Sequence, residues 1–224
     1  MSTCLNLMPH NRKGVLITFC GLDGCGKTTM INMLQDYFKY YGINVALTKQ
    51  PTDNMRQSHI FRTYMDAEDH SAYSYRSLSL MAAADRIQHC NHVVLPVLDQ
   101  GTVLISDRYI YSCLANLRAR GYTGDQWIYD VATREIPRPD LAFFLDVPVE
   151  LAIQRVRKRP EERARYIDVD LQYRLRDEYK KICEDNHGIL LSSDIDVKNT
   201  FDQILHHVEQ YIEHPYGCVL GSKF

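Results

Sequence analysis

Short runs of apolar residues, rich in β-branched and aromatic side chains, recur along the chain between longer segments of helical spacing. These runs occupy 15–20, 43–47, 103–105, 141–145 and 188–191. Continuous apolar runs of this length are typical of strands whose two faces are both covered, as in a parallel sheet. The pattern therefore predicts five buried strands.

Segments with apolar residues three and four positions apart predict helices. They span 28–41, 71–98, 149–158, 169–185 and 197–213. We expect the second helix to be interrupted or bent near Pro96, because proline cannot donate the helical hydrogen bond. Strands that alternate with helices need crossover connections, so the chain is predicted to be an α/β protein with helices on both faces of a parallel sheet. Ligands of such sheets bind at the carboxyl ends of the strands.

Composition and charge narrow the class of protein. The chain has 224 residues, of which 45% are hydrophobic and 24% charged, and we expect one domain over 1–224. A net charge of −2 disfavours a nucleic-acid-binding surface, and no apolar run approaches the roughly 18 residues of a membrane span. The first residues lack the pattern of a secretory signal, and the seven cysteines form no C-x-x-C pair. We therefore expect reduced thiols and a cytoplasmic location.

The clearest chemical motif directly follows the first predicted strand and opens the first predicted helix. Its spacing, Gly21-x4-Gly26-Lys27-Thr28, is that of a P-loop, in which backbone amides and a lysine bind nucleotide phosphates. A glycine-rich turn with an incidental lysine is the alternative, but the strand before it and the helix after it favour the P-loop. We expect ATP as the cofactor. Its predicted binding residues are Gly21, Asp23, Gly24, Cys25, Gly26, Lys27, Thr28 and Thr29.

The rest of the chain favours a kinase over other P-loop classes. A GTPase would carry an Asn-Lys-x-Asp loop, which is absent, and no strand ends in the Asp-Glu pair typical of ATPase motors. Asp107 and Arg108 end the third strand, where the carboxylate can hold Mg²⁺ together with Thr28 and the arginine can hold an acceptor phosphate. A helix-opening aspartate beside a surface arginine is the alternative interpretation.

A second cluster of arginines lies at 155–165, with five arginines in eleven residues. We interpret 155–167 as a mobile flap that brings arginine to the transferring phosphoryl group, although interleaved glutamates also fit a solvated helix end. The predicted catalytic residues are Lys27, Asp107, Arg108, Arg155, Arg159 and Arg165, with Arg157 and Arg163 as further flap candidates.

Taken in order, these motifs resemble the thymidylate kinase family. The resemblance rests on GLDGCGKTT at 21–29, LMAAADR at 80–86, VLISDRYIYS at 103–112, RPDLAFFLDV at 138–147 and the arginine-rich flap. It implies the P-loop nucleoside-monophosphate kinase fold with a five-stranded parallel sheet, a homodimer formed through helices, and transfer from ATP to dTMP to give ADP and dTDP. The P-loop lacks an internal arginine, as in bacterial-type members, whose flap supplies it instead.

The resemblance also implies an acceptor site. Asp23 is similar to the residue near the acceptor 3′-hydroxyl, Arg86 to the arginine at the base and phosphate, and Arg108 to the acceptor-phosphate arginine. The full predicted acceptor set is Asp23, Gln50, Pro51, Ala82, Arg86, Arg108, Ser112, Asn116 and Tyr166.

Three positions of this acceptor set depart from the family. Ala82 and Asn116 stand where the family has aromatic residues, and Gln50 stands where an acidic residue often precedes the proline. Because stacking of the base on an aromatic ring is lost, and Asn116 adds a donor and an acceptor that an aromatic lacks, we hypothesise that the base site is altered and that dTMP is a weak acceptor. The alternatives to a dTMP kinase are therefore a kinase for another nucleotide acceptor, such as a modified nucleotide in a specialised pathway, and a nucleotide-binding regulatory protein without turnover.

Overall fold

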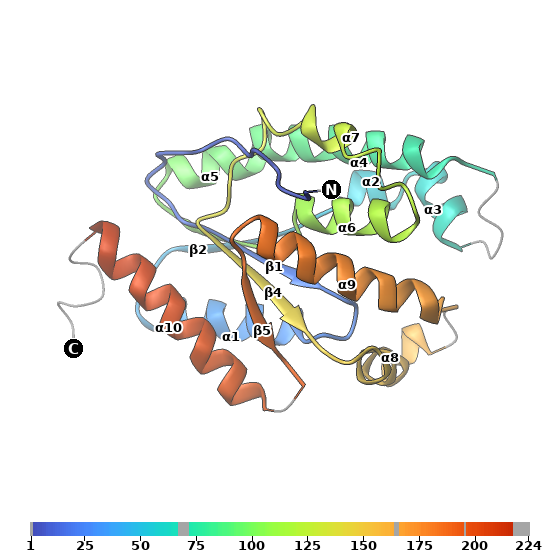
Figure 1. The fold of residues 1–224 in the computed structure, drawn as a ribbon. Coiled ribbons are helices and arrows are strands. Elements are labelled where there is room, and N and C mark those ends of the chain that lie inside the picture. Colours follow the sequence, from blue (N-terminus) through green and yellow to red (C-terminus); the bar gives the residue numbers. More distant parts are fainter. Residues whose placement is uncertain (1, 67–71, 164–165, 195, 217–224) are drawn as a thin grey trace.

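A five-stranded, all-parallel sheet forms the centre of the molecule (Figure 1). The computed structural model describes residues 2–66, 72–163, 166–194 and 196–216. The strands, in chain order, are β1 Leu16–Gly21, β2 Val45–Lys49, β3 Val103–Asp107, β4 Leu141–Asp146 and β5 Ile189–Ser192. Their order in the sheet is β2-β3-β1-β4-β5. The predicted strands and the α/β class are confirmed.

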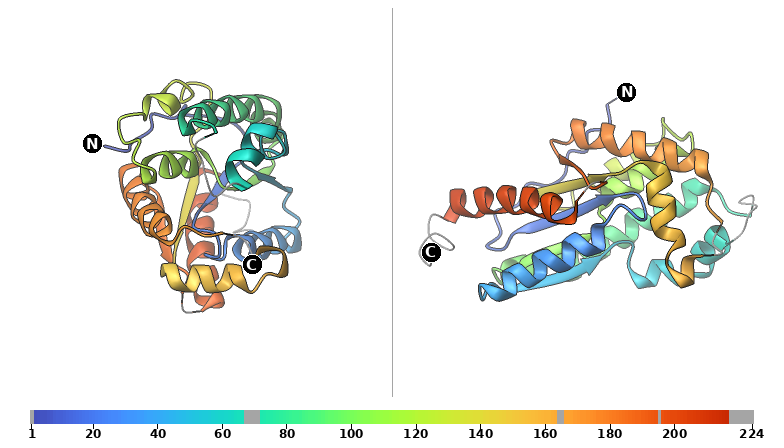
Figure 2. Two further views of the ribbon diagram at one scale, coloured as in Figure 1. Left: turned by 90° about the vertical axis from the view of Figure 1, so that its right-hand side faces the viewer. Right: turned by 90° about the horizontal axis from the view of Figure 1, so that it is seen from below.

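Helices cover both faces of this sheet (Figures 1 and 2). On one face lie α1 Lys27–Tyr40 and α10 Val197–Tyr216. On the other lie α5 Leu95–Asp99, α6 Ile110–Ala119 and α9 Val169–Asp185, with α4 Tyr75–His89 and α7 Trp127–Asp130 packed outside them. The remaining helices are α2 Asp53–Arg56, α3 His59–Asp66, α8 Val149–Arg157 and a 3₁₀ turn at Pro160–Glu162. No described helix is long and apolar enough to cross a membrane.

The long helix predicted over 71–98 is interrupted earlier than expected. Residue 71 lies outside the described residues, and α4 begins at Tyr75, where the Ser74 hydroxyl accepts a hydrogen bond from the amide of Arg76. A π-helical turn at Cys90–Val94 then joins α4 to α5, whose first turn contains Pro96. Because proline lacks the amide hydrogen and clashes with the preceding turn, the helix widens before Pro96 rather than at it.

Helix α6 was not predicted from the sequence. Nearly every residue between Ile110 and Ala119 is buried, so the helix has no continuous polar face to produce an amphipathic pattern. It packs against α4 and α9 and follows directly from the end of β3. It therefore positions the predicted acceptor residues Ser112 and Asn116.

The register of the sheet brings the motifs together. Phe19 of β1 pairs with Asp107 of β3, and Gly21 pairs with Leu145 of β4. Lys49 at the end of β2 pairs with Asp107 from the other side. The P-loop therefore begins between the carboxyl ends of β3 and β4, as expected for a ligand site on such a sheet.

Candidate active site

Two glycines of the P-loop have conformations or contacts that a side chain would disturb. Gly26 caps α1 with φ of 94°, in the left-handed region that glycine adopts without strain. Gly24 has φ of 85°, and a Cβ there would lie 2.3 Å from the backbone oxygen of Ala152 in α8. The loop therefore packs closely against α8 at Gly24, and Gly26 leads directly into α1.

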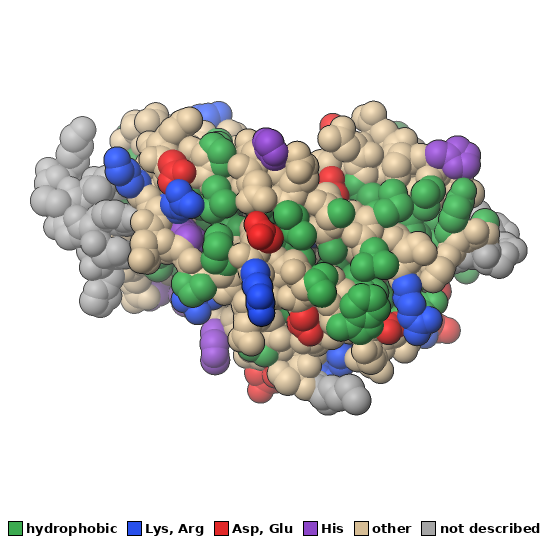
Figure 3. Space-filling model, turned by 90° about the horizontal axis from the view of Figure 1, so that it is seen from above, with side chains coloured by type: hydrophobic (Ala, Val, Ile, Leu, Met, Phe, Trp, Pro, Cys, Tyr) green, Lys and Arg blue, Asp and Glu red, His purple; other side chains and the backbone are tan. Residues whose placement is uncertain are grey.

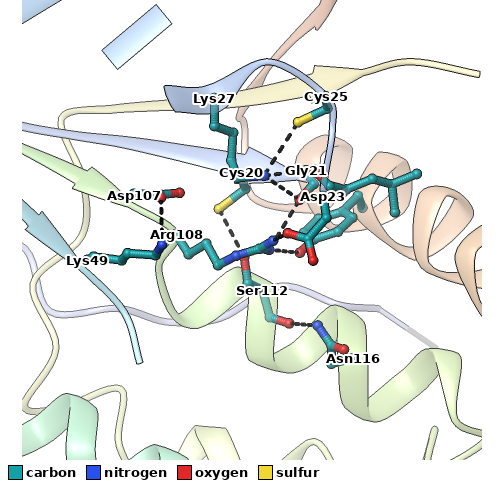
Figure 4. Close-up of polar contacts among 12 residues, drawn as sticks. Cys20, Gly21, Asp23, Cys25, Lys27, Lys49, Asp107, Arg108, Ser112 and Asn116 are labelled. Atoms are coloured by element: carbon teal, nitrogen blue, oxygen red, sulfur yellow. Dashed lines mark hydrogen bonds and ion pairs between the residues drawn. The ribbon is translucent and has the colours of Figure 1, made fainter. Parts of the chain in front are cut away.

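Lys27 is folded inside the loop (Figure 4). Its Nζ donates to the backbone oxygens of Leu22 (2.7 Å) and Gly21 (3.1 Å) and lies 3.6 Å from Cys25 Sγ. These contacts hold the ammonium group at the mouth of the loop. The side chains of Thr28 and Thr29 are exposed at the start of α1, where a nucleotide phosphate would contact them.

Asp107 has a carboxylate oxygen that fits a metal ligand. Its Oδ2 lies 3.6 Å from Lys49 Nζ, whereas its Oδ1 is buried and has no hydrogen-bond partner among the described residues. Oxygen ligands and a hydroxyl across the same cavity, that of Thr28, suit Mg²⁺, which uses one or two carboxylates plus substrate phosphates. The described residues contain no cluster of three His, Cys, Asp or Glu side chains that could hold a metal by themselves.

Arg108 is held on several sides. It has φ of 71°, unusual for a non-glycine residue, and its amide donates to the Phe19 oxygen (2.8 Å). Its guanidinium donates to the Asp23 carboxylate, to the Gly21 oxygen (3.2 Å) and to the Tyr179 hydroxyl (3.0 Å). Burial alone would lower the pKa of Arg108, but Asp23, Tyr179 and Asp107 together outweigh burial, so the pKa of Arg108 is raised. The guanidinium therefore stays charged and aimed across the P-loop.

These side chains line one cavity of about 350 Å³, part of it open to solvent. Four cationic and two carboxylate side chains line it, an excess of two positive charges in a chain whose net charge is −2. A cavity of this charge favours a polyanion. Its lining residues are Asp23, Gly24, Gly26, Lys27, Thr28, Lys49, Asp107, Arg108 and Arg159. The structure thus brings eight predicted residues together and adds Lys49.

The flap arginines occupy different positions. Arg155 lies within α8 and donates to the backbone oxygens of Ser193 (3.0 Å) and Gly24 (3.5 Å). Arg157 donates to the oxygen of Arg163 (2.6 Å), whereas Arg159 reaches the cavity. Arg165 lies outside the described residues. Among the described arginines of this segment, Arg159 is therefore placed to meet a phosphate.

The loop after β2 is held by hydrogen bonds to β3, α4 and α2. The amide of Gln50 donates to the Asp107 oxygen (3.0 Å), and its buried side-chain Nε2 lies 3.0 Å from His89 Nδ1. Pro51 follows through a cis peptide bond, and its oxygen accepts from Arg56 Nε (2.6 Å). The Gln50 Oε1 atom is buried with no hydrogen-bond partner among the described residues. These residues adjoin the cavity through Asp107 without lining it.

Arg86, predicted to hold the acceptor, is almost completely buried. Its exposed fraction is 1%, and its NH1 donates to the Ala82 oxygen (2.9 Å). Its Nε has no hydrogen-bond partner among the described residues. Neither Arg86 nor Ala82 lines the phosphate cavity, so their role at the acceptor stays a prediction.

Two further acceptor candidates lie on α6. Ser112 donates to Cys20 Sγ at 3.7 Å, a weak contact. Asn116 donates through Nδ2 to the Ser112 oxygen (2.8 Å), and its Oδ1 accepts from Arg120 NH1 (2.8 Å). Both ends of the Asn116 amide are therefore engaged within the helix. Tyr166, the last candidate, has an exposed side chain at the far end of the flap.

Sequence reasoning missed three residues of this region. Lys49 could have been found because it ends a predicted strand, where ligands of parallel sheets collect. Arg56, which anchors the loop after β2, follows that loop by only a few residues. Burial, and to a smaller extent the nearby Arg108, lower the pKa of Arg56, while neighbouring aspartates oppose the shift. Tyr179 reaches Arg108 from α9, a contact that no sequence pattern signals.

Comparison with known proteins finds similarity to one family along most of the chain. The profile of the family described as thymidylate kinase matches residues 19–204. A probable thymidylate kinase from Pyrococcus horikoshii is 39% identical over 174 residues, covering 77% of this chain and 84% of that protein. A thymidylate kinase from Sulfurihydrogenibium is 32% identical over 202 residues, 88% of this chain and 98% of that protein. One from Halothermothrix orenii is 29% identical over 93% of this chain and 99% of its own length.

Proposed function

Because the chain belongs to the thymidylate kinase family, we propose that it transfers the γ-phosphoryl group of ATP to the 5′-phosphate of dTMP, giving ADP and dTDP. The observation that carries the proposal is the cavity at the mouth of the P-loop, which joins Lys27, Asp107 and Arg108. Its excess of positive charge suits two nucleotides whose phosphates meet there.

In this reaction an oxygen of the acceptor phosphate forms a bond to the γ-phosphorus, and the bond from that phosphorus to the β–γ bridging oxygen breaks. Catalysis then consists of positioning and charge neutralisation. Lys27 and the loop amides would bind the ATP phosphates, and Arg108 would bind the acceptor phosphate. Thr28 and Asp107 would hold Mg²⁺, which neutralises charge on the phosphates. Arg159 would cover the phosphoryl group and exclude water.

The family match favours dTMP over the other acceptors that the altered base site suggested. The test is steady-state ADP release with ATP and Mg²⁺ across dTMP, dUMP, dCMP, CMP, UMP, GMP and AMP. We expect the highest kcat/KM with dTMP, within the ordinary range of about 10⁴–10⁸ M⁻¹s⁻¹. A higher kcat/KM with another monophosphate would identify that nucleotide as the preferred acceptor. No ADP release with any of them would contradict the proposal that the protein is a kinase.

We also propose that the enzyme is a cytoplasmic homodimer whose single kinase domain spans 1–224. We place the dimer interface on the face formed by α4, α5 and α7, because hydrophobic side chains gather there (Figure 3). The exposed apolar residues of this face are Leu80 on α4, Val93 in the π turn between α4 and α5, Trp127 on α7, and Val131 directly after α7. The described buried cysteines are free thiols, which fits a reducing compartment. Light scattering after gel filtration tests the dimer, and Leu80→Glu should shift it toward monomer.

A further inference from the structure

Lys49 and Asp107 face each other because of the sheet register. They end the neighbouring strands β2 and β3 and are direct partners in the parallel pairing. Lys49 Nζ lies 3.6 Å from Asp107 Oδ2, and both side chains line the phosphate cavity (Figure 4). The ammonium group therefore already stands inside the site that the reaction uses.

The two partners of this ion pair differ in their surroundings. The Lys49 side chain is 54% exposed, whereas that of Asp107 is 17% exposed. An ion pair with one exposed member contributes little to stability, so Lys49 can leave Asp107 at small cost. Asp107, by contrast, keeps its second oxygen buried without a hydrogen-bond partner among the described residues. Asp107 is the more buried partner with an oxygen still open to a ligand, and Lys49 is the partner with room to move.

Charge balance shows where Lys49 would go. A carboxylate that gives its oxygens to a divalent cation no longer attracts the neighbouring ammonium, which is then repelled by the cation. The nearest anions would be the phosphates in the same cavity, opposite Arg108 and Arg159. A four-carbon side chain with three rotatable donors can make such a change without movement of β2.

Resting on the proposed kinase function, we propose that Lys49 is a further phosphate-binding catalytic residue that exchanges partners: it neutralises Asp107 in the empty site and moves to the transferring phosphoryl group when Asp107 receives the metal–nucleotide. The exchange gives the Asp107 carboxylate a positive partner in both states: the ammonium at Oδ2 in the empty site, and the metal once the nucleotide binds. It also delivers one more cation to the phosphates only when the nucleotide and its metal are both bound.

The exchange predicts opposite effects of one substitution on turnover and on metal binding. Lys49→Met keeps most of the length of the side chain and removes its charge, and Lys49→Arg keeps the charge. Lys39→Met, on an exposed position at the end of α1, is the matched control. We expect Lys49→Met to lower kcat by about 10- to 100-fold, somewhat less than the loss of a fully enclosed donor. Lys49→Arg should recover most of this loss, and Lys39→Met should match the wild type.

Metal binding is measured separately, from the signal of free Mn²⁺ in electron paramagnetic resonance during titration of the protein with ADP bound. Removing the competing ammonium from Asp107 should make Lys49→Met bind Mn²⁺ several-fold more tightly than the wild type. Lower kcat together with tighter Mn²⁺ binding supports the exchange. Unchanged kcat, or Mn²⁺ binding that is unchanged or weaker, overturns it.

This readout needs no acceptor and no turnover. If the wild type releases no ADP with any monophosphate, the proposed function fails while the Mn²⁺ titration still decides whether Lys49 competes for Asp107. Thermal midpoints of all variants should agree with that of the wild type, because the Lys49 side chain is half exposed.

Discussion

Arg155 in α8 donates to the backbone oxygen of Ser193, at 3.0 Å, in the segment that follows β5. It also approaches the Gly24 oxygen at 3.5 Å, so one guanidinium ties α8, the P-loop and the β5–α10 connection together. Arg159, four residues later, makes no such anchoring contact with the described part of the chain, and it lines the phosphate cavity. Two arginines of one predicted flap therefore serve different purposes.

From these positions we expect Arg155 to contribute to stability and Arg159 to contribute to turnover. Arg155→Ala should lower the free energy of unfolding by about 1 kcal/mol, because it removes hydrogen bonds to two carbonyl groups. Arg159→Ala should leave that free energy unchanged and lower kcat by at least about tenfold, because it removes a cation from the phosphoryl site. Urea unfolding and steady-state kinetics measure both. A large loss of stability in Arg159→Ala would contradict the assignment.

Lys27→Met tests the P-loop. The ammonium should meet charge that develops on the phosphates, so we expect kcat to fall by about 10²–10³-fold. Lys27 is also 7% exposed and donates to two loop carbonyl groups, so the free energy of unfolding should fall by about 1–2 kcal/mol. Lys39→Met is the control for both measurements. Near-normal turnover of Lys27→Met would show that the phosphates bind elsewhere.

The glycines of the P-loop offer a matched pair of substitutions. In Gly24→Ala the added Cβ would lie 2.3 Å from the Ala152 oxygen, so we expect a loss of about 3 kcal/mol in the free energy of unfolding. In Gly26→Ala the Cβ meets nothing within 4 Å, and only the left-handed backbone is strained, at about 1–2 kcal/mol. Urea denaturation of both variants separates the two costs. Equal losses would mean that α8 moves away from the added methyl group at little cost in free energy.

His89 predicts a dependence of stability on pH. It lies between Thr48 Oγ1 (2.7 Å) and Gln50 Nε2 (3.0 Å), and burial lowers its pKa, with Arg86 adding to the shift and Asp85 opposing it. Because folding favours the neutral ring, its contribution to stability is complete above the unfolded pKa of about 6.5 and is lost as pH falls below that value.

The test compares the free energy of unfolding at pH 7.5 and pH 5.5. The wild type should be less stable at the lower pH, and His89→Gln should show a smaller difference between the two values. His59→Gln, at an exposed position of α3, should keep the wild-type difference. If His89→Gln keeps the full difference, other titrating groups cause the loss of stability at pH 5.5.

The sequence was most informative where one local pattern decides the structure. Apolar runs located the five strands, and the spacing of Gly21, Gly26 and Lys27 located the phosphate end of the sheet. It was silent about α6, whose surfaces are nearly all buried. It also could not pair Lys49 with Asp107, because that contact depends on the register between two strands far apart in the chain.

Other parts of the site depend on where helices end and how they pack, which the spacing of residues along the sequence does not reveal. The arginine-rich segment was recognisable, but which arginine reaches the cavity depends on where α8 ends, at Arg157. The Arg108–Tyr179 contact depends on how α9 packs against the sheet, which no local signal encodes. The contact between Asn116 and Arg120, in contrast, is between residues four apart on a helix and was open to prediction.

That last contact bears on the acceptor base. The sequence suggested that Asn116 offers its amide to a base, yet Nδ2 donates to the Ser112 oxygen and Oδ1 accepts from Arg120. Arg120 in turn lies over the Tyr75 ring, 4.4 Å from its centre. Asn116 therefore joins α6 to α4 through Arg120 and Tyr75, and one donor and one acceptor site of its amide are already used within the protein.

We therefore expect Asn116→Ala to lower the free energy of unfolding by about 1 kcal/mol while KM for dTMP changes by less than about threefold. Arg120→Leu should cost a similar amount of stability, and the double variant should cost less than the sum, because both single changes break the same contact. If Asn116 instead binds the base, Asn116→Ala would leave a polar group of the nucleotide unpaired and raise KM by about tenfold or more. Kinetics with dTMP and urea unfolding of the three variants distinguish the two roles: a large rise in KM with unchanged stability would return Asn116 to the acceptor site.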